Sequence, residues 1–184
     1  MKTNSGKTWN PRRLDVRAFA EAGAALQADL PLSSLKRLLA ERVPDHGGET
    51  MIAWQARGEM RPGNGGVPGV WMHLQASADV PLSCQRCLAP VITRLDVDRW
   101  FRFVADETMA EAEDDESEED VLALEPRPDL LDLLEDELLM ALPLVPMHET
   151  CPAPLPAVVD DSATSPEEPS TPPHPFAALA RLRK

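Results

Sequence analysis

The feature that most constrains this chain is a period-two alternation of apolar and polar residues through its middle. From Val70 to Val80, every second residue is apolar, and the residues between them are Trp71, His73, Gln75, Ser77 and Asp79. The same alternation recurs over residues 51–60 and 88–105. Successive side chains of a strand point to opposite faces of its sheet. One apolar and one polar face therefore predict an antiparallel β-meander that is covered on one side only.

Apolar residues at helical spacing predict helices that cover the apolar face of this sheet. The alanine-rich stretch 15–26 and the stretch 33–43, with Ser33 as its expected N-cap, are the first two. Residues 26–32 fit a short strand as well. The strongest helix covers residues 129–142, where a broad leucine stripe ends at Pro143. We expect its acidic residues on the opposite, solvated side: Asp129, Asp132, Glu135 and Asp136. The predicted fold class is α+β.

Composition predicts one modest domain with several irregular segments. The 184 residues include 19 prolines, and only 4% are aromatic. We expect a single α+β domain over residues 14–151, preceded by a flexible basic arm at 1–13. An acidic low-complexity loop at 106–120 is predicted to be disordered, before a short edge strand at 121–124. Residues 152–173 are predicted to form a disordered Pro/acid-rich linker, and residues 174–184 are predicted to form a short helix.

The net charge of −13 is unevenly distributed. The acidic excess lies after residue 105, whereas the part before it carries slightly more Lys and Arg than Asp and Glu. A basic face on that part could meet phosphates, because charges are screened within about 8 Å at physiological salt. The predicted RNA-binding residues are Arg86, Arg94, Arg99, Trp100 and Arg102. The alternative, that these arginines are strand-face charges balanced by Asp96 and Asp98, stays open.

All three cysteines of the chain fall in two short segments. Cys84 and Cys87 form a C-x-x-C pair between two predicted strands, and His148 precedes Cys151 at the same spacing. Three thiolates and one imidazole are a tetrahedral ligand set for Zn²⁺, so the pattern predicts one structural zinc ion. Three buried thiols without a metal remain the alternative. A redox pair is disfavoured, because such a pair usually sits at a helix N-terminus.

The sequence lacks the common catalytic motifs. It has no H-E-x-x-H, no Ser/His/Asp spacing and no phosphate-binding loop, since the glycines of residues 63–69 are not followed by Lys-Ser/Thr. No apolar run suits a signal peptide or a membrane span. These features predict a cytoplasmic binding protein without enzymatic activity.

Four motifs, in this order, resemble the YceD-like family of bacterial and plastid large ribosomal RNA subunit accumulation proteins. They are the cysteine motif 84–88, the acidic leucine-rich segment 129–146, the His148/Cys151 pair and the terminal Pro175-Phe176-Ala177-Ala178-Leu179. The resemblance implies a non-enzymatic role in the synthesis, processing or stability of 23S ribosomal RNA. Its partners would be a ribosomal RNA precursor or a large-subunit assembly intermediate, and ribosomal proteins.

Two other functions remain open on the sequence. In a protein–protein adaptor, Phe176, Leu179 and the acidic helix would recruit a ribosomal protein or a nuclease, and the chain would not touch RNA. In a thiol oxidoreductase, Cys84 and Cys87 would cycle through a disulfide.

Overall fold

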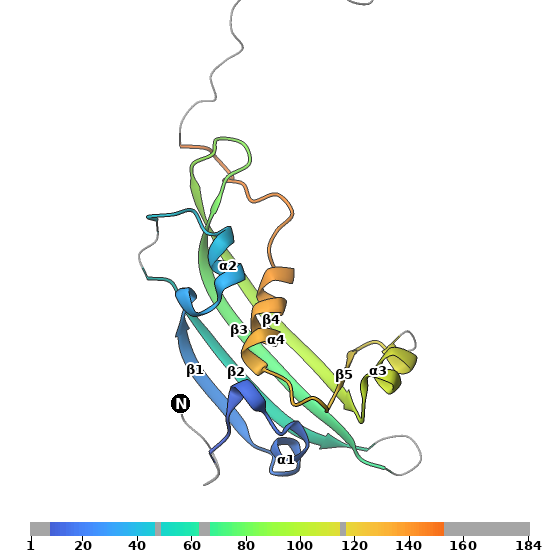
Figure 1. Ribbon diagram of the computed structural model, residues 1–184. Coiled ribbons are helices and arrows are strands. Elements are labelled where there is room, and N and C mark those ends of the chain that lie inside the picture. The colour runs from blue at the N-terminus through green and yellow to red at the C-terminus, as the bar shows by residue number, and fades with distance from the viewer. Residues whose placement is uncertain (1–7, 47–48, 63–66, 115–116, 153–184) are drawn as a thin grey trace, which may run out of the picture. The chain divides into compact units, whose positions relative to one another are not determined.

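The computed structural model describes residues 8–46, 49–62, 67–114 and 117–152. The predicted linker and short helix, with Phe176 and Leu179, lie outside the described residues. A five-stranded sheet in the order β1-β2-β3-β4-β5 forms the centre of the described part (Figure 1). Its strands are β1 (Ala25–Pro31), β2 (Met51–Arg61), β3 (Gly69–Ser83), β4 (Pro90–Val104) and β5 (Asp120–Ala123). Strands β1 to β4 pair as an antiparallel meander, as predicted, and β5 runs parallel to β4.

The register of the strands sorts their side chains as the alternation predicts. Trp54 lies opposite Ala76, which lies opposite Val97, and all three are buried. The polar residues between them form the other face of the sheet. We call the apolar side the inner face and the polar side the outer face.

Helices α1 (Val16–Glu21), α2 (Lys36–Glu41) and α4 (Leu130–Met140) lie over the inner face (Figure 1). Helix α3 (Glu107–Asp114) lies beside β5, and two 3₁₀ turns, η1 (Pro11–Arg13) and η2 (Leu32–Ser34), complete the described elements. Leu134 and Leu138 of α4 are fully buried, as are Phe19 of α1 and Leu38 of α2. The predicted α+β class, with helices on one face, is confirmed.

The first predicted helix is shorter than its alanine-rich sequence suggests. Helix α1 ends at Glu21, and Gly23 adopts the left-handed conformation with φ +52°. Glycine there ends a helix because it has no Cβ to clash with the preceding turn. The chain then enters β1, so residues 25–31 are a strand.

The predicted N-cap at Ser33 is wrong, and so is the exposed position expected for Glu135. Ser33 lies in η2, and α2 begins at Lys36 without a side-chain cap of its own. The buried Glu135 carboxylate of α4 instead accepts hydrogen bonds from the backbone N–H groups of Arg37 (2.7 Å) and Leu38 (3.2 Å). Glu135 thus does for α2 what an N-cap does, because the end of α2 abuts α4.

Residues 107–114 of the acidic stretch form helix α3, where we predicted a disordered loop. Asp106 accepts a hydrogen bond from the Met109 N–H at the start of α3, and Ala110 packs with Val104 and Val121. The prediction rested on the high charge and the few apolar residues of this stretch, and it did not anticipate this small apolar cluster. The described end of the predicted flexible arm is also packed, since Trp9 is 5% exposed and meets Phe19 edge to face at 5.3 Å.

Candidate functional site

The C-x-x-C pair occupies the turn between β3 and β4, as predicted. The Cys84 N–H donates to the Ala89 carbonyl at 3.0 Å, and the Leu88 N–H donates to the Cys84 carbonyl at 2.8 Å. Leu88 has φ +59°, a conformation that bulky residues rarely adopt. The backbone is therefore folded tightly around the two thiols, and we call residues 84–89 the knuckle.

The second ligand pair reaches the knuckle along the segment that follows α4. The Gln85 N–H donates to the Pro146 carbonyl at 2.9 Å, and this contact joins the two segments. In Figure 1 the chain leaves α4 and runs beside the β3–β4 turn. Together with the buried leucines of α4, this contact fixes His148 and Cys151 next to Cys84 and Cys87.

The four side chains fit a tetrahedral metal ion. One ligand atom from each of Cys84, Cys87, His148 and Cys151 lies within 4.8 Å of all the others. The Cys87 Sγ and His148 Nδ1 atoms are 3.5 Å apart. Ordinary Zn–S and Zn–N bond lengths place two such tetrahedral ligands about 3.6 Å apart. The structure thus brings together all four predicted ligands, and the donor set suits Zn²⁺.

The surroundings of His148 also suit a metal ligand. Its Nε2 atom lies 3.0 Å from the Pro90 carbonyl oxygen, which can only accept a hydrogen bond. Nε2 must therefore carry the proton in the neutral ring, and Nδ1 keeps its lone pair for the ion. Histidine ligands of metals commonly make this second hydrogen bond to a carbonyl or a carboxylate.

The thiols of the cluster differ in how readily they ionise. Burial would raise the pKa of Cys84, but the backbone N–H groups of Cys87, His148 and Arg86, with the His148 side chain, lower it to about 5. Burial raises the pKa of Cys151, and the nearby Cys87 and Cys84 raise it further. A divalent cation would offset this repulsion, which is why thiolate clusters favour one.

The predicted RNA-binding residues do not form one continuous strip. Arg94, Trp100 and Arg102 lie on the outer face, whereas Arg99 lies on the inner face beside α4, with its guanidinium 3.6 Å from Glu137. Arg86 belongs to the knuckle, near the Met147 sulfur atom. One-residue steps along a strand alternate between the faces, which separates Arg99 from Trp100. RNA binding by this set stays a prediction.

Three of these arginines form ion pairs within the described residues. Arg94 pairs with Asp79 (3.4 Å) and Asp96 (3.0 Å). Arg99 pairs with Asp120 at 2.5 Å. Arg102 pairs with Glu113 of α3 at 2.5 Å. The alternative of locally balanced strand charges thus describes Arg94, although its partners include Asp79 in place of the expected Asp98.

Trp100 belongs to a stack that sequence reasoning missed. The His73 ring lies parallel to it, with centroids 4.2 Å apart and an interplanar angle of 4°. The Arg61 guanidinium carbon lies 3.7 Å from the Trp100 ring centre and 4.7 Å from that of Trp71. His73 is directly opposite Trp100 in the β3–β4 register, so the exact register was the missing signal.

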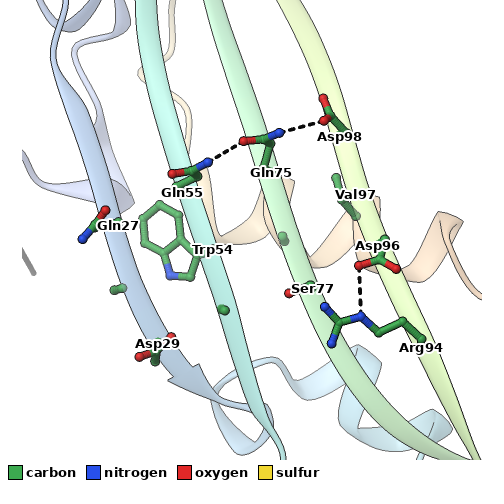
Figure 2. A pocket seen from close by; sticks show the side chains of 13 residues that line it. Gln27, Asp29, Trp54, Gln55, Gln75, Ser77, Arg94, Asp96, Val97 and Asp98 are labelled. Atoms are coloured by element: carbon green, nitrogen blue, oxygen red, sulfur yellow. Dashed lines mark hydrogen bonds and ion pairs between the residues drawn. The ribbon is translucent and has the colours of Figure 1, made fainter.

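A shallow cavity of about 840 Å³ lies farther along the outer face (Figure 2). The Gln75 amide donates to Asp98 at 2.7 Å and is also hydrogen-bonded to Gln55, so three strands are joined by a polar row. His73 lies 2.6 Å from the other oxygen of Asp98, and the hydrogen bonds from His73 and Gln75 lower the Asp98 pKa. Asp29 and Asp96 also line this cavity and make it acidic.

None of the described helices is long and apolar enough to cross a membrane.

Comparison with known proteins gives one consistent relationship. The model of a protein family, described as "Large ribosomal RNA subunit accumulation protein YceD", matches residues 72–183. A curated protein of that name from Haemophilus influenzae (strain ATCC 51907 / DSM 11121 / KW20 / Rd) is 35% identical over 115 residues. The match covers 62% of this chain and 66% of that relative, slightly less than two thirds of its length. No solved structure matches the chain.

Proposed function

Because this chain belongs to the YceD family of large ribosomal RNA subunit accumulation proteins, we propose that it supports the accumulation of 23S ribosomal RNA. It would act in the synthesis, processing or stability of that RNA, in the cytoplasm, as a binding factor and not as an enzyme. Its partner would be a ribosomal RNA precursor or a large-subunit assembly intermediate. The observation that carries this proposal is the family match, which includes most of β3 and all of β4, the knuckle and α4.

The metal centre would be structural in this function. One Zn²⁺ ion held by Cys84, Cys87, His148 and Cys151 would supply charge neutralisation and a fixed cross-link. It would join the β3–β4 turn to the segment after α4, which are 61 positions apart at Cys87 and His148. Every side chain of the set is then used as a ligand, and none is left as a nucleophile or a proton carrier. This arrangement favours a binding role over thiol–disulfide chemistry.

The test of this function is the ratio of 23S to 16S ribosomal RNA in cells that lack the chain. We expect the ratio to fall on deletion and to return when the full chain is supplied from a plasmid. A variant with Cys84→Ser and Cys87→Ser should restore it poorly, and His46→Ala, which changes an exposed histidine outside the cluster, should restore it fully. An unchanged ratio in the deletion strain would exclude the proposed function.

An adaptor role is the second candidate, and the charge of the outer face supports it. Asp29, Asp96 and Asp98 line the outer-face cavity with a single arginine, Arg94. Such a surface suits the basic segments of ribosomal proteins. Phe176 and Leu179 would then add an apolar contact with a ribosomal protein or a nuclease. Capture of a ribosomal protein that persists after RNase treatment, and is lost in Phe176→Ala/Leu179→Ala, would support the adaptor.

A further inference from the structure

Charge divides the outer face of the sheet into two ends. Toward the β2–β3 connection, the outward residues of β2, β3 and β4 include three arginines, two tryptophans and one histidine: Arg57, Arg61, Trp71, His73, Trp100 and Arg102. Glu59 is the single carboxylate among the outward residues of these strands there. The rest of this face carries four aspartates and one arginine: Asp29, Asp79, Asp96, Asp98 and Arg94, of which Asp98 borders the first set through its contact with His73. We call the first set the arginine–tryptophan end.

The side chains of the arginine–tryptophan end are already ordered as a stack. A guanidinium 3.7 Å and an imidazole 4.2 Å from the centre of the same indole cannot share one face of that ring. Trp100 therefore lies between His73 and Arg61, and Arg61 also contacts Trp71. The stack runs His73, Trp100, Arg61, Trp71. Its two terminal rings belong to His73 and Trp71.

The backbone makes room for the Trp71 end of the stack. A Cβ atom on Gly69 would lie 2.9 Å from the Trp71 Nε1 atom, so glycine lets the indole lie close to the strand. Arg61 is in turn held by Glu59, whose carboxylate is 2.9 Å from its Nε atom. Trp71 and Trp100 remain partly exposed, because α1, α2 and α4 all lie on the other side of the sheet (Figure 1). The structure thus keeps two indoles at the surface in fixed orientations.

Positive charge is available beside the stack. Arg57 is exposed, and no ion pair holds it among the described residues. It lies directly opposite His73 in the β2–β3 register, and Arg102 lies opposite Trp71 in the β3–β4 register. Arg102 is already paired with Glu113 and hydrogen-bonded to Ser117, so Arg57 supplies the unpaired positive charge beside the stack. The aspartates of the other end would repel a phosphate chain and confine it to this one.

We propose that the arginine–tryptophan end binds an unpaired segment of RNA. Bases would stack on the outer faces of His73 and Trp71 and extend the existing stack, and a phosphate would meet Arg57. Aromatic rings and guanidinium planes are the surfaces on which proteins stack single-stranded bases. A duplex keeps its bases stacked on one another and offers no such partner. This inference rests on the proposed function and adds the contact surface and the form of RNA.

The test is fluorescence anisotropy of the full-length protein with a labelled single-stranded RNA 12-mer from 23S ribosomal RNA. Trp100→Ala removes the centre of the stack, so that His73 and Arg61 lose the ring that orders them, and should weaken binding about tenfold, on the order of one lost base-stacking contact. Arg57→Ala should weaken binding about fivefold and lower the dependence on salt by about one phosphate contact. The matched control is Lys36→Ala, which also removes one exposed positive charge but lies on α2, on the other side of the sheet, and should leave the affinity unchanged.

Arg57→Ala also keeps the proposal testable if Trp100→Ala fails to fold, because Arg57 is exposed and has no ion-pair partner in the described part of the chain. Equal weakening by Lys36→Ala and Arg57→Ala would overturn the proposal. So would binding of the same sequence as a duplex with equal affinity, or no effect of either Arg57→Ala or Trp100→Ala. If no variant matters but deletion still lowers the 23S to 16S ratio, this inference fails and the proposed function stands. An unchanged ratio on deletion rejects the proposed function instead.

Discussion

The Nδ1 atom of His148 lies 3.5 Å from the Sγ atom of Cys87, although 61 positions separate the two residues along the chain. The contact exists because the segment after α4 hydrogen-bonds to the knuckle, through Gln85 and Pro146 and through His148 and Pro90. Two short motifs that are unremarkable alone become one tetrahedral ligand set. The first prediction follows from this geometry.

The purified protein should contain one zinc ion per chain, measured by mass spectrometry of the metal. Cys151→Ser and His148→Ala should each reduce the bound zinc well below one ion per chain, because each removes one of four ligands. His46→Ala is the control, since His46 is exposed and outside the cluster. Chelation should also lower the thermal midpoint, because metal binding contributes to folding. Full occupancy in both ligand variants would contradict the assignment.

The strands could be predicted from the sequence far better than the helix ends. Alternation placed β2, β3 and β4 and sorted their faces, because one side of the sheet packs and the other meets solvent. The start of α2 depended on a tertiary contact, with Glu135, that no local pattern carries. Glu135 looked like part of a solvated acidic face, and only its contact with the start of α2 explains its burial.

The metal-ligand set could be predicted from the sequence, whereas the stack of His73, Trp100, Arg61 and Trp71 could not. Cysteine is rare in this chain, so the spacing of Cys84, Cys87 and Cys151 was informative on its own. Arg61 and Trp71 carry no such signal. They meet Trp100 only because the registers of β2, β3 and β4 place them on the same face at the same end of the sheet.

Glu135→Gln should destabilise the protein by about 1–3 kcal/mol in urea unfolding, because the side chain is buried and its charge-assisted hydrogen bonds cannot be replaced by water. The substitution weakens the hydrogen bonds that Glu135 accepts from the backbone N–H groups of α2 and from the Arg37 guanidinium, 3.0 Å away. Asp132→Asn, on the exposed side of the same helix, is the control and should change stability little. Similar unfolding midpoints for the two variants would argue against the capping role.

The same residue predicts a pH dependence of stability. Burial alone would raise the Glu135 pKa, but the Leu38 N–H and the Arg37 guanidinium and N–H outweigh it and lower the pKa in the folded protein. The unfolded chain therefore binds this proton more readily. The stabilisation that the Glu135 carboxylate gives the folded protein is fully present above its pKa in the unfolded chain, which is about 4.3. The contribution is lost as the pH falls through the lower folded value. Unfolding curves of wild type and Glu135→Gln should converge in this acidic range, and a constant difference down to pH 2 would refute the assignment.

Gly58 is a site where α1 packs closely against β2. A Cβ atom there would lie 2.7 Å from the Phe19 ring and 2.8 Å from the Ala20 backbone, which cannot move aside cheaply. Gly58→Ala should therefore cost about 1–3 kcal/mol of stability, as overpacking of a core usually does. Ser77→Ala, on the outer face of β3, is the control in the same unfolding experiment. A variant as stable as wild type would mean that α1 is not seated on β2 in this way.

Ultraviolet crosslinking in living cells, followed by sequencing of the RNA attached to the tagged full-length protein, would show whether this protein contacts RNA directly. We expect crosslinks concentrated on large-subunit ribosomal RNA. Trp100→Ala should reduce them about tenfold at equal protein level, and Lys36→Ala should not. If crosslinks are absent while the protein still co-purifies with large-subunit particles, direct RNA binding is contradicted, and the adaptor role becomes the account to test.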